Sequence, residues 1–240
     1  MPRAHAPLTR AVRPALEAVV VPGKAEGMAA YMKHKGRYLG VPKPQRAAVQ
    51  RALFREHALT DAAVLTATVE KIWAQARYRE ERYLALDLLN LPRHKKLLGL
   101  HALPLLERLV VEGAWWDLVD ACSGPLGVLL VQDRAAMTKT MRAWARDSDL
   151  WKRRSAIICQ LKLKEATDAK LLYAAIESAL TAPGLISDLP EREQRFFLSK
   201  AAGWGLRQYA RIEPLAVRDY VVEHKDALPR LTQSEALKHL

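Results

Sequence analysis

The tryptophans and aspartates between residues 115 and 120 form the first cluster whose types and spacing could do chemistry. Trp116 and Asp120 are four residues apart, so on a helix they share one face and can meet a common ligand. A carboxylate stabilises a cationic group by its charge, and an indole ring does so by its quadrupole. In the alternative interpretation, Asp117 complements the dipole of a helix N-terminus and Trp116 anchors the core. Spacing alone favours this structural interpretation.

A basic stripe with an aromatic residue in its middle is predicted near residue 200. Four residues follow one another at i, i+4, i+7 and i+11 on one helix face: Lys200, Trp204, Arg207 and Arg211. A basic face that only contacts water rarely carries a tryptophan at its centre. The glycines on both sides of this tryptophan each cost a helix about 1 kcal/mol relative to alanine, and they open the backbone to close approach. Phosphates along the stripe, with an aromatic contact between them, explain the pattern better than solubility does.

A third candidate, Trp151-Lys152-Arg153-Arg154, follows an expected helix cap at Ser148-Asp149. Basic residues in the first turn of a helix oppose its dipole, so the dipole does not explain them. Together with the free backbone N–H groups of that turn, Lys152, Arg153 and Arg154 could bind a phosphate. Simple exposure of these side chains to solvent explains the pattern equally well.

The charge of the chain favours a polyanionic partner. Its 240 residues include 38 Lys and Arg against 26 Asp and Glu, which gives a formal net charge of +12. Nucleic acid and an anionic membrane surface both fit such an excess, as does a general basic bias. No stretch approaches the roughly 18 apolar residues that cross a bilayer, and the first residues lack a signal peptide. We therefore expect a soluble, intracellular protein with no membrane partner.

Other chemistries find little support in the sequence. The histidines show no paired metal-ligand spacing, and there is no GxGxxG motif, P-loop or nucleophile elbow. We therefore expect neither a metal nor a cofactor. Cys122 and Cys159 each lie inside an apolar run, and we expect both to be buried free thiols.

The apolar residues recur with a helical period almost throughout, and strand-like alternation is almost absent. Thr60-Asp61, Ser148-Asp149 and Thr167-Asp168 each precede an apolar periodic run, as helix N-caps do. Prolines fall between such runs or in first turns, where a missing N–H costs little. The pattern predicts roughly twelve helices joined by short connections.

Three of these helices begin with charged and aromatic residues and continue through small residues into an apolar stripe. They start at Arg79, Trp151 and Arg195. Aligning Arg82 with Arg154 gives a spacing of about 72 residues, close to two HEAT-length units. We predict one all-α domain over residues 1–240, a superhelical solenoid of HEAT-like repeats whose concave, basic face suits a rod-shaped partner. A plain helical bundle would show the same periods.

Seven segments, spread over nearly the whole chain, form a specific pattern by their order and number. They are Met28–Lys33, Tyr38–Pro42, Ala85–Leu89, Trp115–Asp120, Leu150–Ile157, Phe196–Ala210 and Glu235–Leu240. Together these segments resemble the AlkD-like DNA alkylation repair family of HEAT-like repeat glycosylases.

The resemblance implies an alkylpurine DNA N-glycosylase, a hydrolase of base excision repair. It implies that Asp120 is the catalytic carboxylate and that Trp116 and Trp204 line the deoxyribose of the lesion. It further implies backbone contacts by Arg154, Arg207 and Tyr31. The connection from Thr181 to Arg192 looks longer than the family's usual one, and we expect it to reshape the edge of the DNA cleft.

Alkylation at N3 or N7 makes a purine cationic and therefore a good leaving group, so that no strong general acid is needed. One carboxylate and aromatic faces suffice to stabilise an oxocarbenium-like sugar and deliver water. Most base-acting enzymes flip their target base into a pocket. The resemblance implies that here the lesion instead stays stacked in the duplex. We expect a cytoplasmic monomer that acts on duplex DNA and associates with the nucleoid. The alternative is a non-catalytic HEAT-like module that binds nucleic acid or protein.

Overall fold

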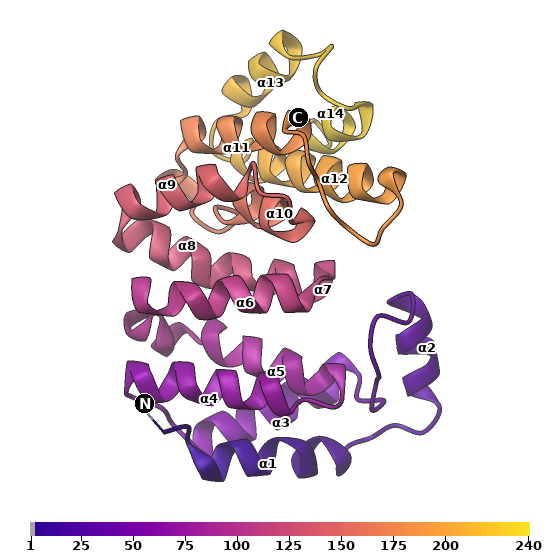
Figure 1. The fold of residues 1–240 in the computed structure, drawn as a ribbon, viewed down its shortest axis with the longest axis vertical. Coiled ribbons are helices and arrows are strands. Elements are labelled where there is room, and N and C mark those ends of the chain that lie inside the picture. The colour runs from indigo at the N-terminus through magenta and orange to yellow at the C-terminus, as the bar shows by residue number, and fades with distance from the viewer. Residues whose placement is uncertain (1–2) are drawn as a thin grey trace. The chain divides into compact units, whose positions relative to one another are not determined.

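The computed structural model describes residues 3–240, which are all-α apart from one isolated β-bridge between Asp149 and Ile186. They form fourteen α-helices and four short 3-10 helices, which confirms the predicted fold class (Figure 1). The chain comprises two compact units, Met1–Leu105 and Leu106–Leu240, which are described separately below. The single domain, the HEAT-like repeats and the concave basic face stay predictions.

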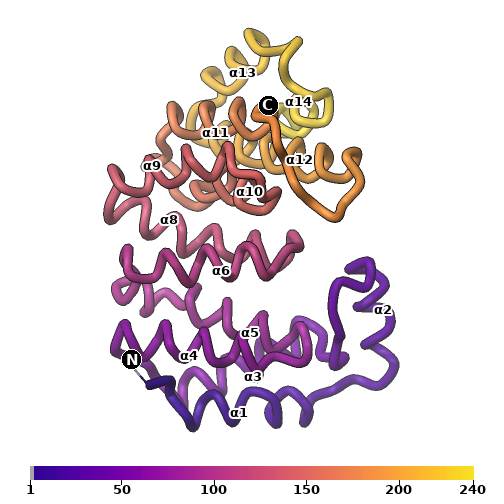
Figure 2. The backbone as a smooth tube through the Cα atoms, in the orientation of Figure 1, coloured from indigo at the N-terminus to yellow at the C-terminus, as the bar shows by residue number. Residues whose placement is uncertain are grey.

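The first unit contains five α-helices and two 3-10 helices. Their bounds are α1 Ala6–Glu17, α2 Lys24–Tyr31, α3 Lys43–Glu56, α4 Ala62–Gln75, α5 Arg79–Asn90, η1 Pro92–Leu97 and η2 Leu100–Ala102. Helices α1, α3, α4 and α5 pack against one another through apolar faces. Helix α2 buries none of its residues and stands apart from them within this unit (Figure 2).

The buried carboxylate of Glu80 fixes the segment that follows α2. It lies in the first turn of α5 and accepts hydrogen bonds from the backbone N–H groups of Leu39, Gly40 and Val41 at 3.0–3.1 Å. Next to it, Arg79 donates to the carbonyl of Lys35 at 2.5 Å. Charge-assisted bonds of this kind are about twice as strong as neutral ones, so two residues of α5 anchor the segment after α2.

The second unit contains nine α-helices and two 3-10 helices, and α6 begins at its boundary. Their bounds are α6 Leu103–Gly113, α7 Trp116–Val119, η3 Asp120–Cys122, α8 Ser123–Gln132, α9 Arg134–Trp144, α10 Leu150–Ile158, η4 Lys164–Ala166, α11 Ala169–Thr181, α12 Glu191–Tyr209, α13 Pro214–Glu223 and α14 Arg230–Ala236. With only four residues, α7 is too short to show a period in the sequence, which helps to explain why fewer helices were predicted.

Helix α10 lies at the centre of the second unit, where it packs against α9, α11 and α12. It begins where the sequence predicted, because the carboxylate of Asp149 accepts from the N–H groups of Trp151 and Lys152 at 2.8 Å. The predicted caps at Asp61 and Asp168 are confirmed in the same way. Almost every residue of α10 is buried. Neighbours therefore surround this helix on all sides, and its polar side chains must find partners inside the protein.

The two glycines of α12 serve the packing of helices. A Cβ on Gly203 would lie 2.4 Å from Cβ of Glu235, so only glycine lets α14 approach this closely. A Cβ on Gly205 would lie 3.2 Å from Leu172 on α11 and 3.5 Å from Ile157 on α10. The sequence predicted that these glycines open the backbone of α12 to close approach, and the groups that approach it are the neighbouring helices.

The cysteines and the lengths of the helices are two simple features of the described residues. Cys122 and Cys159 are buried free thiols as predicted, and burial raises the pKa of each to about 12. Within residues 3–240, every helix is too short or too polar to pass through a lipid bilayer.

Candidate functional site

The side chain of Arg154 joins three elements of the second unit. Its Nε and Nη2 donate to Oδ1 and Oδ2 of Asp120 at 2.7 and 2.8 Å, and its Nη1 donates to the carbonyl of Phe197 at 2.7 Å. Asp120 begins η3, Arg154 lies on α10, and Phe197 lies on α12. This fork-to-fork pairing fixes both the position and the orientation of the carboxylate.

Asp120 is buried on one side and open on the other. Its side chain is 15% exposed, against 6% for Arg154. Burial raises the pKa of the Asp120 carboxyl, while the hydrogen bonds and charge of Arg154 oppose that rise and nearby Asp117 adds to it. The guanidinium therefore favours an ionised carboxylate where burial alone would favour the neutral acid.

A cluster of three aromatic rings lies among the same elements. The ring centres of Trp115, Trp151 and Phe197 are 5.1–5.9 Å apart in edge-on or tilted pairs, and all three residues are buried. Such pairs contribute about 0.5–1.5 kcal/mol each beyond the burial of their area. The cluster fixes the start of α7 against α10 and α12 and so holds the Asp120–Arg154 pair in place. Nothing in the spacing of Trp115 and Trp151 along the sequence indicated this packing role, because their rings meet only through the contact of α7, α10 and α12.

The two predicted sugar-contacting tryptophans are partly exposed, Trp116 on α7 and Trp204 on α12. Trp116 precedes Asp120 by one turn, and its backbone carbonyl accepts a hydrogen bond from the backbone N–H of Asp120. Trp204 lies seven residues beyond Phe197 on α12, which is about 10 Å along the helix axis. Because Arg154 bonds both Asp120 and Phe197, Trp204 lies within about 20 Å of Asp120, or about two helix diameters. The structure thus gathers the predicted catalytic residues in one unit.

Two predicted DNA-binding cations have partners inside the protein instead. Arg153 is 2% exposed and donates to the carbonyls of Asp147, Ala182 and Pro183 at 2.6–2.7 Å. These bonds secure the connection between α11 and α12, whose Ile186 also donates its N–H to the carbonyl of Ser148 at 2.7 Å. The expectation that Arg153 contacts phosphate is therefore corrected: its guanidinium holds the connection that sequence analysis found unusually long.

Lys152 is also engaged, although it is less buried. Its ammonium lies 2.5 Å from the carboxylate of Glu107 and 3.2 Å from that of Asp147. It also lies 5.8 Å from the centre of the Trp144 ring. Two carboxylates next to Lys152 offset the attraction of its ammonium for a phosphate, so Lys152 is not a free cation.

On α12, a carboxylate from α14 neutralises much of the predicted basic stripe. Glu235 pairs with Lys200 at 2.8 Å and also with Arg207. Hydrogen bonds from Lys200 and then Arg207 lower the pKa of Glu235 to about 2. Nothing in the sequence indicated this pairing, because Glu235 follows the two cations by 35 and 28 residues.

The remaining two predicted DNA contacts differ from these. Arg211 is exposed just beyond the end of α12, and its side chain makes no hydrogen bond or ion pair with residues 3–240. Tyr31, in the first unit, is 73% exposed at the end of α2.

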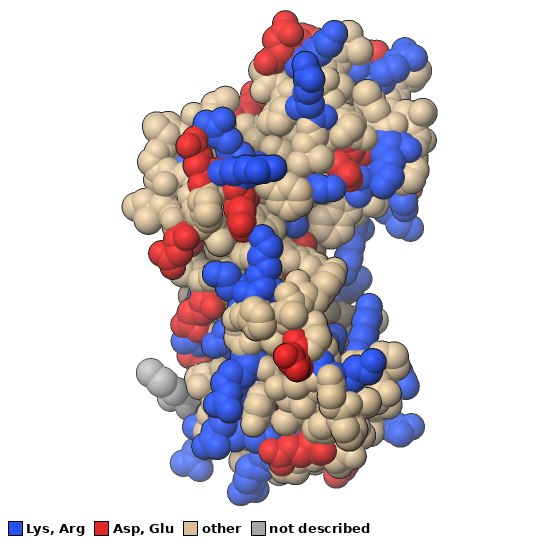
Figure 3. All heavy atoms as spheres, turned by 90° about the vertical axis from the view of Figure 1, so that its right-hand side faces the viewer, with Lys and Arg blue, Asp and Glu red and all other residues tan. Residues whose placement is uncertain are grey.

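The surface view shows charges of both signs. In Figure 3, Lys and Arg side chains are spread over the face shown of each unit, with Asp and Glu side chains among them. The described residues contain no group of three or more metal-ligating side chains. The carboxylate of Asp120, fixed by Arg154, is suited to stabilising a cation by its charge, and the nearby aromatic faces can add to this.

Residues 12–240 match the family described as "DNA alkylation repair enzyme". Among solved structures, the chain is similar to one described as "Predicted DNA alkylation repair enzyme from Enterococcus faecalis", with 32% sequence identity and a TM-score of 0.75. That similarity covers 92% of this chain and 96% of the other. No curated protein matches the chain.

Proposed function

The chain belongs to the family of DNA alkylation repair enzymes, and we propose that it is a glycosylase that releases cationic N3- or N7-alkylated purines from duplex DNA. The observation that carries this proposal is the Asp120 carboxylate, oriented by Arg154 on a partly open surface beside Trp116. The reaction is hydrolysis of the N-glycosidic bond, with water as the second substrate.

The role of Asp120 follows from where charge develops. As the bond between sugar and base stretches, the cationic purine leaves as a neutral base and positive charge moves to the deoxyribose. A fixed carboxylate stabilises that charge, and it can also orient the attacking water. Each carboxylate oxygen has two lone-pair directions, so the bonds to Arg154 leave acceptor capacity on both oxygens.

Arg154 is a positioning residue in this proposal. Sequence resemblance implied a phosphate contact, but three of its five N–H donors are bonded inside the protein. Its charge opposes the burial that would otherwise protonate Asp120. Trp116 and Trp204 provide the aromatic faces for the cationic sugar.

We also propose that the lesion is hydrolysed without entering a base pocket. In support, the pocket of about 390 Å³ in the second unit is not lined by Asp120, Trp116 or Trp204. The protein would approach from the sugar and backbone side, with Arg211 and Tyr31 as exposed backbone contacts and Lys200 and Arg207 as contacts tempered by Glu235. It would act as a cytoplasmic monomer at the nucleoid.

Base release from a defined lesion tests the proposal. A duplex with one 7-methylguanine is incubated with the protein, the released base is identified by mass spectrometry, and the abasic site is cleaved with alkali. The matched duplex with guanine is the control. We expect 7-methylguanine to be released and guanine to be retained. Binding of both duplexes without any release would instead show a non-catalytic nucleic-acid-binding module.

A further inference from the structure

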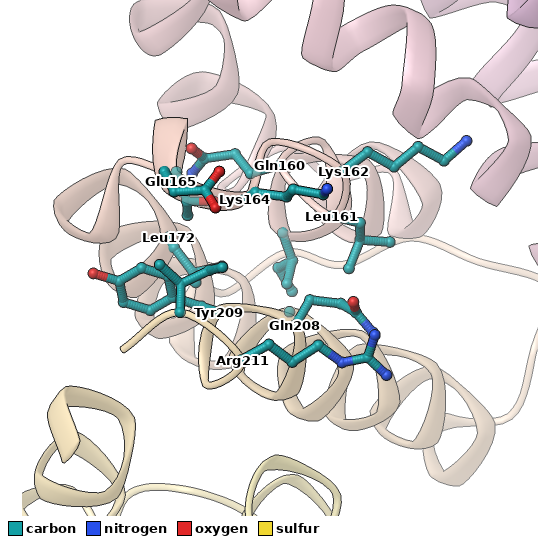
Figure 4. A pocket seen from close by; sticks show the side chains of 13 residues that line it. Gln160, Leu161, Lys162, Lys164, Glu165, Leu172, Gln208, Tyr209 and Arg211 are labelled. Carbon is teal, nitrogen blue, oxygen red and sulfur yellow. The ribbon is translucent and has the colours of Figure 1, made fainter. Parts of the chain in front are cut away.

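A pocket in the second unit lies beyond the carboxyl ends of α10 and α12. Its cavity volume of about 390 Å³ falls in the range of small-molecule sites, roughly 300–1,000 Å³. Figure 4 shows Leu161 and Lys164 on one side of the space and Gln208 and Arg211 on the other. None of the proposed catalytic residues lines it.

The base of the pocket is apolar. Ile157, Leu172 and Gly205 are buried there, where α10, α11 and α12 meet. Leu161 and Ile212 add further apolar lining. Such a surface favours a flat, weakly polar group such as an aromatic ring.

The rim of the pocket is cationic, and its cations are available. Lys162, Lys164 and Arg211 are exposed, and their side chains make no hydrogen bond or ion pair with the described residues. Glu165 supplies one opposing carboxylate, so the rim carries a net charge of about +2. An anionic group is therefore attracted to this rim, since no internal carboxylate has to be displaced.

The loop that presents the two lysines is fixed in place. The side-chain amide of Gln160 donates to the carbonyl of Asp168 at 3.1 Å and accepts from its N–H at 2.8 Å. Arg134 donates to the carbonyl of Ala166 at 3.2 Å. Lys164 itself has φ of 51°, in the left-handed region that disfavours lysine. A loop already held in one conformation loses little entropy on binding a ligand.

One polar side chain in the pocket has both a donor and an acceptor to offer. Gln208 lies one turn past Trp204 on the same face of α12, and Arg211 follows just beyond the end of this helix. Its amide makes no hydrogen bond within the described residues. A carboxamide of this kind pairs with the edge of a nucleobase.

We propose that this pocket binds one nucleotide, with its phosphate between Arg211 and the two lysines and its base against the apolar floor beside Gln208. Inorganic anions would leave the apolar floor unused, and an uncharged ring compound would leave the cations unpaired. The nucleotide can be a free monophosphate or an unpaired nucleotide of a DNA strand. Only the second source rests on the proposed function. In that case the pocket would hold a nucleotide of the strand that carries the lesion, one turn along α12 from Trp204.

Calorimetric titration with deoxyadenosine 5′-monophosphate tests the free source. Deoxyadenosine and inorganic phosphate are titrated separately and should bind more weakly, because each satisfies half of the site. Arg211→Gln should weaken binding of the nucleotide about tenfold by removing a charged hydrogen-bond donor. Lys164→Gln should also weaken it, because this change removes the charge and keeps the side chain's length and the backbone conformation of the loop. Glu165→Gln should strengthen binding about threefold by removing the opposing charge.

A duplex with one unpaired adenosine, compared with its fully paired counterpart by fluorescence anisotropy, tests the strand source. Tighter binding of the bulged duplex that disappears in Arg211→Gln supports this source. The matched control is Lys170→Gln, which removes an exposed cation of α11 outside the pocket. The inference is overturned if neither probe binds preferentially, or if Lys170→Gln has the same effect as Arg211→Gln. Excision is not a readout here, so a failed glycosylase assay leaves this result unchanged.

Discussion

Cationic side chains lie at both ends of α10, but those at its start have partners inside the protein and those just past its end do not. At its start, Lys152, Arg153 and Arg154 all bond to groups inside the second unit. Just past its end, Lys162 and Lys164 have no partner among the described residues. The difference teaches that a cation in the sequence indicates an anionic ligand only where the fold supplies no competing acceptor.

The cations on and just after α12 show the same difference between paired and unpaired side chains. Lys200 and Arg207 share the carboxylate of Glu235, whereas Arg211 stays unpaired one turn beyond Arg207. The basic stripe predicted from spacing is therefore divided. Lys200 and Arg207 hold α14 against α12 through Glu235, whereas Arg211 lines the pocket.

The largest effect is expected when the engaged end of α10 loses its central pair. Arg154→Met leaves Asp120 without its partner in a mostly buried position, so the free energy of unfolding should fall by about 3–5 kcal/mol in urea titrations. The double variant with Asp120→Asn should recover much of that loss, because no buried charge is then left unpaired. A loss below about 1 kcal/mol would show that the pair is solvated like a surface ion pair.

A smaller loss of stability is expected for Arg153→Met. Four backbone carbonyls lose a charged donor, which should cost about 2 kcal/mol and make the connection between α11 and α12 more sensitive to proteolysis. The affinity for duplex DNA should change by less than about twofold, because this guanidinium does not reach the surface. Lys152→Met is the matched control, and it should cost at most about 1 kcal/mol. A large fall in DNA affinity for Arg153→Met would restore the phosphate contact predicted from sequence.

Glu235→Gln should sharpen the comparison along α12. Without the carboxylate, Lys200 and Arg207 are free to pair with phosphates, so the affinity for duplex DNA should rise several-fold at low salt. The dependence on salt should steepen as well, because more counterions are released. Anisotropy titrations at two salt concentrations measure both. Weaker binding would mean that Glu235 positions the two cations for DNA.

The pH dependence of excision should show the environment of Asp120. Because burial raises its pKa above the ordinary 3.8, the single-turnover rate should fall as the pH drops through that raised value, when the neutral acid loses its charge. The rate should be independent of pH above it. Asp120→Asn should show no such acid limb. Spontaneous depurination, measured without protein at each pH, is subtracted.

The fold could be predicted from the sequence because its signals are local. Periodic apolar residues and the caps at Asp61, Asp149 and Asp168 depend only on neighbouring residues, and the structure confirms them. The partners of the cations depend on tertiary contacts between distant segments, as for Glu235 and Arg153. The sequence held one hint at the burial of Arg153, since Leu150, Trp151, Ala156 and Ile157 are spread around its helix and do not share one face.

Single-turnover excision by Asp120→Asn tests the central claim most directly. The amide keeps the shape and one oxygen that can accept from Arg154, but the negative charge is gone; because Arg154 then lacks its charged partner, a urea titration first shows that the variant is folded under the assay conditions. Excision of 7-methylguanine should slow by about a hundredfold or more, equal to about 2.7 kcal/mol of transition-state stabilisation. Affinity for the damaged duplex, titrated at the same salt concentration, should be retained or increase. Excision at the wild-type rate would contradict the account, because Asp120 would then be a structural partner of Arg154 and not a catalytic residue.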